Sequence, residues 1–233
     1  MKFTWMAATA AVAVAGVCLA GPGPAQAAGN AVLGGSSGLV FDNNSACSLT
    51  AIGYDGANRL VGLTAGHCAS TGARVSAEKA PDAGVIGVVA YSDNGEGLDF
   101  GVLQFDPALV TPVRTVGPTT IAGLGAVPGP GATVCTSGRT SGSGCGVVWG
   151  GLEGSTINQS CSKPGDSGGP VTVGDRLVGM NQGRLTGLGG IGFDVPCVSA
   201  GNPVHSPAFF APIDQILEAV NATGGVGTGF RPF

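Results

Sequence analysis

The chain has little charge, few aromatic side chains and almost no histidine. Only 10% of its 233 residues are charged, 6% are aromatic and two are histidine, and the formal net charge is -4. A balance this mild, with no stripe of Lys and Arg, argues against nucleic acid as a partner. The sequence also has no Cys-x-x-Cys pair and no Cys/His cluster, which argues against structural zinc. No metal or organic cofactor is implied.

A long apolar run is also missing. The apolar stretch Met6–Ala20 is short of the roughly 20 residues that a membrane-spanning helix needs. Lys2 precedes it, and Ala25–Ala27 (Ala-Gln-Ala) follows with the small-x-small pattern of a signal peptidase site. We therefore predict a signal peptide over residues 1–27, no stable membrane anchor, and a secreted mature chain over residues 28–233.

Glycine is abundant, with 44 residues scattered among Val, Leu, Ile and Phe rather than set in a collagen-like repeat. The glycines separate short apolar segments such as Leu60–Leu63 and Gly101–Phe105, a pattern typical of strands. A Gly/Pro-rich connection over residues 117–131 divides the mature chain into similar halves. We expect an all-β fold of two tandem barrels, over about residues 28–116 and 117–233.

One helix is expected near the C-terminus. Pro212 suits a first helical turn. Ile213, Ile216, Leu217 and Val220 follow with the i, i+3, i+4, i+7 spacing of one helix face. This face predicts a structural helix that packs on a barrel.

Six cysteines remain after the predicted signal peptide, which removes Cys18. An even number in an exported chain implies disulfides, although the sequence alone leaves several pairings open. The six are Cys47, Cys68, Cys135, Cys145, Cys161 and Cys197.

Two segments carry the residue types of nucleophilic catalysis. A serine hydroxyl is a poor nucleophile until an imidazole takes its proton, and the imidazole needs a carboxylate to orient it. His67 lies in Thr64–Cys68 (Thr-Ala-Gly-His-Cys), and Ser167 lies in Gly165–Pro170 (Gly-Asp-Ser-Gly-Gly-Pro). Glycines around the serine permit a tight loop that exposes the hydroxyl. Each segment taken alone also fits an ordinary polar turn.

Together the two segments resemble the histidine and serine motifs of the trypsin/chymotrypsin superfamily of serine proteases, peptidase family S1. Residues 134–140 and 209–213 are similar to segments of its bacterial streptogrisin and α-lytic protease branch. The resemblance extends over nearly all of the mature chain. It implies two six-stranded antiparallel β-barrels with a C-terminal helix. It also implies a serine endopeptidase that hydrolyses peptide or protein substrates through an acyl-enzyme intermediate. Nothing in the sequence suggests more than a monomer.

The acidic member of the triad lies between these motifs, because the family order is His, Asp, Ser. Leu98–Leu103 resembles the family's Asp motif, with Asp99 at the start of an apolar strand. Asp93 and Asp106 stand in turn-like contexts, where an acid often has no catalytic role. We therefore predict that His67, Asp99 and Ser167 form the triad.

The resemblance also implies an oxyanion hole and a set of disulfides. The hole consists of the backbone N–H groups of Gly165 and Ser167. The implied disulfides are Cys47–Cys68, Cys135–Cys145 and Cys161–Cys197.

The resemblance places Gln159 and Ser160 at the base of the pocket for the P1 side chain of the substrate. No carboxylate stands there, which disfavours Arg or Lys at P1 and favours an apolar or small side chain. His205 suggests a different specificity, because some glutamate-specific relatives use histidines to bind an acidic P1 residue. A histidine in a proline-containing loop is more often simply exposed, which is the reading we favour.

The strand that binds the substrate backbone is expected to include Gln182, Gly183 and Arg184. Gln182 stands where the family usually has serine, and Arg184 stands where it usually has glycine. We expect Gln182 to hydrogen-bond near the triad carboxylate and Arg184 to narrow the mouth of the pocket.

The carboxylate of Asp166 in the serine motif usually pairs with an arginine in secreted bacterial relatives. Thr136 stands at the matching position, and Arg139 is a candidate substitute.

Two other function classes fit parts of the sequence. One is a catalytically silent module that keeps the fold and binds extended peptides, although fold stability does not require an intact triad. The other is an esterase, because Gly165–Gly169 formally satisfies Gly-x-Ser-x-Gly. The α/β-hydrolases that carry that pattern alternate strands with helices and place histidine last, which this sequence contradicts.

Overall fold

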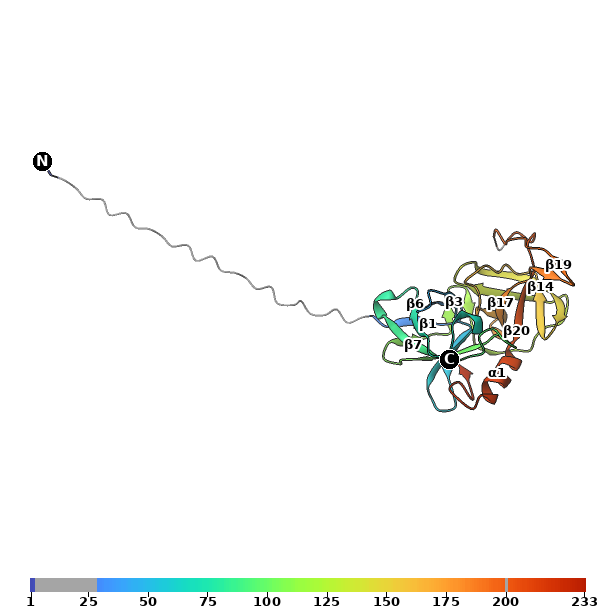
Figure 1. Cartoon of the computed structure of the whole chain (residues 1–233), viewed down its shortest axis with the longest axis horizontal. Coiled ribbons are helices and arrows are strands. Elements are labelled where there is room, and N and C mark those ends of the chain that lie inside the picture. Colours follow the sequence, from blue (N-terminus) through green and yellow to red (C-terminus); the bar gives the residue numbers. More distant parts are fainter. Residues whose placement is uncertain (3–28, 200) are drawn as a thin grey trace.

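A computed structural model describes residues 1–2, 29–199 and 201–233 of the chain (Figure 1). The predicted signal peptide, apart from its first two residues, and Cys18 lie outside the described residues. Strands dominate, and the elements gather into two sheet systems that lie side by side. The predicted all-β class is confirmed. Within the described residues, the helices are too short to cross a membrane.

The first half forms one curled antiparallel sheet of eight strands, which the C-terminal strand β21 joins, in the order β21-β4-β5-β8-β7-β6-β2-β3. Its end strands are β21 and β3; β4, the neighbour of β21, follows β3 directly in the chain, with only Leu49 and Thr50 between them. The strands are β2 (Gly38–Phe41), β3 (Ala46–Ser48), β4 (Ala51–Tyr54), β5 (Leu60–Thr64), β6 (Arg74–Ala77), β7 (Val85–Ser92), β8 (Gly101–Phe105) and β21 (Arg231–Pro232).

The second half forms a closed barrel, because β17 pairs with both β16 and β20 and so completes the ring β17-β16-β13-β14-β15-β20. A seventh strand, β12, adds to β17 in parallel. The strands are β12 (Gly123–Leu124), β13 (Thr133–Gly138), β14 (Gly142–Leu152), β15 (Ser155–Asn158), β16 (Pro170–Val173), β17 (Arg176–Arg184) and β20 (Ala208–Pro212).

Short elements complete the fold. Three two-stranded ladders pair β1 with β9, β10 with β11, and β18 with β19. Their bounds, with those of two single 3-10 turns, are β1 (Ala31–Leu33), η1 (Gly66–Cys68), η2 (Pro81–Ala83), β9 (Val110–Pro112), β10 (Thr115–Val116), β11 (Thr119–Thr120), β18 (Gly187–Leu188) and β19 (Ile191–Gly192).

The predicted C-terminal helix is α1 (Ile213–Ala222), and it buries Ile213, Ile216 and Val220 as its spacing predicts. These side chains enter a cluster that also contains Leu63 of β5 and Met180 of β17, so α1 packs across both halves. Each large apolar side chain buried there contributes about 1.5–3 kcal/mol. The helix thus fixes one half against the other, and the proposed site residues come from both.

Candidate active site

His67 lies on the short turn η1, directly after the buried strand β5. The disulfide Cys47–Cys68 joins this turn to β3, and the Cys135–Cys145 and Cys161–Cys197 bonds complete the pairing that the resemblance implies. The His67 side chain is 42% exposed, so solvent can reach it. The sulfur atoms of Cys47 and Cys68 lie close to the ring of His67. They are bonded to each other and are therefore not thiolate ligands for a metal.

Asp99 contacts His67 through both carboxylate oxygens. Oδ1 accepts the backbone N–H of His67 at 2.8 Å, and Oδ2 lies 2.7 Å from ring Nδ1. This contact raises the pKa of His67 above its ordinary value, with a smaller contribution from the charge of Asp93 and opposition from partial burial. A carboxylate at Nδ1 keeps the proton there, so Nε2 faces outward as a proton acceptor.

The loop that carries Asp99 is shaped by Asp93, which the sequence suggested is an ordinary turn residue. Its Oδ1 accepts the backbone N–H groups of Gly95 at 3.1 Å and Phe100 at 3.0 Å. Burial raises the pKa of Asp93. The backbone of Asp99 has φ = +53°, a left-handed conformation that Asp tolerates better than most residues. Asp93 therefore closes the loop around the position of Asp99.

Ser167 lies in the loop before β16, and this loop packs directly on the histidine segment. Its carbonyl accepts the backbone N–H of Ser48 at 2.8 Å. The next residue, Gly168, has φ = +79°, and a Cβ there would come within 2.7 Å of the backbone nitrogen of Ala65. The Ser167 hydroxyl donates to the carbonyl of Gln182 at 3.4 Å. No described hydrogen bond joins it to His67, so loop packing is what relates the two residues.

Asp166 is 3% exposed and accepts three backbone hydrogen bonds. Oδ1 accepts the N–H groups of Thr140 and Ser141, both at 2.9 Å, and Oδ2 accepts that of Lys163 at 2.8 Å. These bonds satisfy the buried charge without a cation. Arg139, the candidate substitute for the missing arginine, makes no described hydrogen bond or ion pair with Asp166, although the charge of Asp166 contributes to the raised pKa of Arg139.

Arg139 instead forms a two-pronged ion pair with Glu78, the residue after β6 in the first half. This contact raises the pKa of Arg139 and lowers that of Glu78. Thr136, at the position where relatives carry the arginine, donates its hydroxyl to the carbonyl of Gly144 at 3.4 Å.

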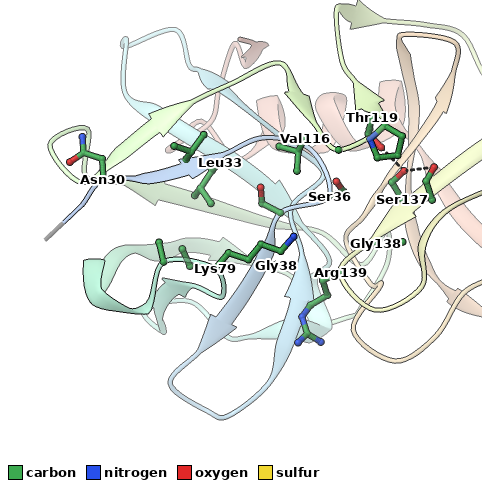
Figure 2. Close-up of a pocket in the computed structure, with 18 residues that line it drawn as sticks. Asn30, Leu33, Ser36, Gly38, Lys79, Val116, Thr119, Ser137, Gly138 and Arg139 are labelled. Atoms are coloured by element: carbon green, nitrogen blue, oxygen red, sulfur yellow. Dashed lines mark hydrogen bonds between the residues drawn. The ribbon is translucent and has the colours of Figure 1, made fainter.

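A cavity of about 430 Å³ lies at the base of the β13–β14 turn, between the two halves and apart from the proposed triad (Figure 2). Thr119 donates to Ser137 at 2.5 Å, and Ser137 donates to Ser143 at 3.0 Å. This chain of hydroxyls ties both strands of the turn to β11. These hydrogen bonds therefore hold in place the β13–β14 turn, whose backbone N–H groups bind Asp166.

The end of β17 has a free edge beside the serine loop. β16 pairs with β17 as far as Met180, and the backbone of Asn181 bonds to Gly168 and Gly169, so the edge without backbone partners on that side is residues 182–184. Gln182 donates its side-chain amide to the carbonyl of Leu98, next to Asp99. Arg184 forms a double ion pair with Asp194, with Nε–Oδ1 at 2.8 Å and Nη2–Oδ2 at 3.1 Å.

Gln159, expected at the base of the P1 pocket, donates its amide to the carbonyls of Pro203 at 3.0 Å and His205 at 2.9 Å. Ser160 is buried and donates to the side chain of Asn158. The expectation that His205 is exposed is wrong, because it is 8% exposed and its Nδ1 lies 2.8 Å from the carbonyl of Ser206.

Among curated proteins the chain is similar to Streptogrisin-C of Streptomyces griseus, with 33% identity over 115 residues. The match covers 44% of this chain and 22% of the relative, so the chain spans about a fifth of that protein's length. No protein-family model matches the chain.

Solved structures are similar over most of the chain. Thermobifida fusca Protease A has a TM-score of 0.64 and 28% identity, covering 84% of this chain and 98% of that one. The chymotrypsin of Cellulomonas bogoriensis has a TM-score of 0.61 and 26% identity, with coverages of 84% and 97%. Nocardiopsis Protease has a TM-score of 0.63 at 24% identity, with coverages of 81% and 96%, and supports the fold alone. The chain has the chymotrypsin fold and is related to the streptogrisin branch of the chymotrypsin-like serine proteases.

Proposed function

We propose that this chain is a secreted serine endopeptidase with Ser167 as nucleophile, His67 as general base and Asp99 as the orienting carboxylate. The observation that carries the proposal is the double contact of Asp99 with the backbone N–H and ring Nδ1 of His67. That contact selects the tautomer a general base needs and stabilises the imidazolium that forms. The similarity to Streptogrisin-C and Thermobifida fusca Protease A adds support.

The proposed reaction follows from these positions. His67 Nε2 takes the proton of Ser167 as Oγ attacks the peptide carbonyl, and the tetrahedral intermediate then releases the amine, which takes that proton from His67, to leave an acyl-enzyme. Backbone N–H groups of Gly165 and Ser167 stabilise the oxyanion, and the loss of one such donor typically costs about 2.7–4 kcal/mol. Water activated by His67 then hydrolyses the acyl-enzyme. The long Ser167–Gln182 hydrogen bond is weak, so the hydroxyl gives it up at small cost.

We propose that the substrate backbone adds as a strand to the free edge at residues 182–184. The P1 side chain then lies beside Gln159 and Ser160, which offer no counter-charge for Arg or Lys. Arg184 is compensated by Asp194, so it is not a free cation for an acidic side chain. This arrangement favours an apolar or small P1 residue.

Export is part of the same proposal. Residues 1–27 act as the signal peptide, and residues 28–233 form the protease domain with halves at about 28–116 and 117–233. The three disulfides suit an oxidising compartment. A silent peptide-binding module is the second candidate, favoured by one observation: no described hydrogen bond joins Ser167 to His67.

A fluorophosphonate probe separates the two candidates. The full chain, a Ser167→Ala variant and a Ser37→Ala control are produced in a secreting bacterium, and the exported proteins are treated with the probe. Covalent labelling of the wild type and the control, but not of Ser167→Ala, is expected. A correctly folded wild type that stays unlabelled contradicts the protease and favours the binding module. N-terminal sequencing of the exported protein tests cleavage near residue 28.

A further inference from the structure

Gly165 is the residue whose N–H the proposed reaction uses as an oxyanion donor, so the inference here rests on the proposed function. Its backbone has φ = +96°, a conformation that favours glycine. A Cβ at this position would lie 2.5 Å from Oγ1 of Thr140 and 2.7 Å from Nη1 of Arg139. The loop is therefore packed closely against the turn between β13 and β14.

The Gly165 N–H belongs to the same peptide group as the carbonyl of Pro164. Thr140 donates its hydroxyl to that carbonyl at 2.8 Å. In a trans peptide the C=O and N–H point in opposite directions, and the described residues contain no cis peptide bond. The hydroxyl of Thr140 thus fixes the direction in which the Gly165 N–H points.

The next peptide group is fixed from the first half of the molecule. Ser48 is fully buried, and its hydroxyl donates to the carbonyl of Gly165 at 2.9 Å while accepting the backbone N–H of Arg139 at 2.9 Å. Its own carbonyl accepts the hydroxyl of Thr64 at 2.9 Å, on the strand that leads to His67. Ser48 therefore contacts the serine loop, the β13–β14 turn and the histidine strand.

We propose that the hydroxyls of Thr140 and Ser48 are positioning groups that hold the two peptide groups on either side of Gly165, so that its N–H stays directed at the oxyanion. Thr140 acts from the second half and Ser48 from the first. Neither side chain touches the substrate. Because a preorganised donor contributes most in the transition state, loss of either hydroxyl lowers kcat and leaves KM nearly unchanged.

Thr140→Val is the first test, because it removes the hydroxyl, keeps the shape and leaves the backbone N–H that binds Asp166. With a peptide anilide chosen by library screening, kcat is expected to fall by about 10- to 100-fold with KM within about twofold. The rate of fluorophosphonate inactivation is expected to fall in parallel. Thr140→Ser, which restores a hydroxyl, is expected to recover most of both rates. Thr115→Val is the matched control, because it removes a hydroxyl of β10 that pairs with Thr120 of β11.

Ser48→Ala is the second test. A fall in kcat of similar size is expected, together with a lower melting temperature, because buried partners lose a hydrogen bond. Ser37→Ala is its control: this buried hydroxyl accepts only the N–H of Gly34, away from the serine loop. If Ser48→Ala does not fold, the two Thr140 variants decide.

The inference is overturned if Thr140→Val keeps the wild-type kcat, if its defect lies in KM alone, or if Thr140→Ser is equally impaired. In each case an active wild type leaves the proposed function standing. A folded wild type with neither activity nor labelling overturns the proposed function and this inference together.

Discussion

The loop around Asp99 and the loop around Asp166 each take a carboxylate out of water, and they satisfy it in different ways. Asp99 keeps 16% of its side chain exposed and directs both oxygens at His67. Asp166 is 3% exposed and faces three backbone N–H groups. The first carboxylate faces a group whose charge changes during the proposed reaction. The second faces groups whose charge never changes.

This difference assigns different work to the two regions. The Asp99 region is organised to respond, since a proton that arrives at His67 is stabilised by the adjacent carboxylate. The Asp166 region is organised to stay fixed, since its partners come from the β13–β14 turn and from Lys163 at the start of the serine loop. Catalysis is therefore expected to depend on the charge of Asp99, and loop geometry on that of Asp166.

The largest expected effect follows from Asp99→Asn. An amide keeps the shape but cannot hold the required tautomer of His67, so kcat is expected to fall by about 10⁴-fold while the melting temperature changes little. Steady-state kinetics and thermal unfolding measure both. Asp106→Asn, which alters an exposed turn acid, serves as the control.

The pH dependence of kcat/KM gives a second test of Asp99→Asn. Asp99 raises the pKa of His67, and the general base must be neutral, so wild-type kcat/KM is lost as pH falls through that raised pKa. Without the carboxylate the pKa drops, and the acid limb of the Asp99→Asn profile is expected to move to lower pH. An unmoved limb would contradict the role of Asp99.

Asp166→Asn is expected to show the opposite balance. The substitution directs an amide N–H at backbone N–H donors and leaves at least one of them unsatisfied, at a cost of about 1–3 kcal/mol. The melting temperature is expected to fall clearly, and kcat by about 10- to 100-fold, less than for Asp99→Asn. Thermal unfolding and kinetics on the same samples test this. Equal stability losses in the two variants would break the comparison.

Much of the fold could be predicted from the sequence, because strands, turns and the helix Ile213–Ala222 rest on local patterns. The two motif segments marked His67 and Ser167 for the same reason. The partners of Asp166 could not be predicted, since a backbone N–H is present whichever side chain accompanies it. Ser48 carries no signal either, because its role depends on the contact between the two halves.

The expectations for His205 and Arg139 both rested on local sequence. His205 was expected to be exposed because prolines flank it, and Arg139 was a candidate partner for Asp166 because it lies three residues after Thr136, the position that matches the family's arginine. The structure buries the histidine beside Gln159 and pairs the arginine with Glu78 of the other half. Both outcomes are tertiary contacts between distant segments, which local composition does not encode.

Glu78→Gln is expected to have the smallest effect on stability and activity. It bears on the comparison of the Asp99 and Asp166 loops, because it releases Arg139 from its ion pair. The ion pair with Arg139 is partly exposed, with side-chain exposures of 30% and 23%, so its loss should cost about 0.2–1 kcal/mol. That cost corresponds to a fall in melting temperature of about 0.4–4 °C. Asp42→Asn, which breaks the more exposed pair with Arg74, should cost less.

The effect of Glu78→Gln on the melting temperature is expected to depend on pH. Arg139 lowers the pKa of Glu78, so the pair stabilises the fold at neutral pH, and this contribution disappears as pH falls through the lowered pKa. The difference in melting temperature between wild type and Glu78→Gln should therefore shrink in acid. Activity should stay at the wild-type level, because backbone N–H groups already satisfy Asp166. If the released Arg139 instead raised activity or stability, the Asp166 loop would need a cation after all, and the contrast with Asp99 would fail.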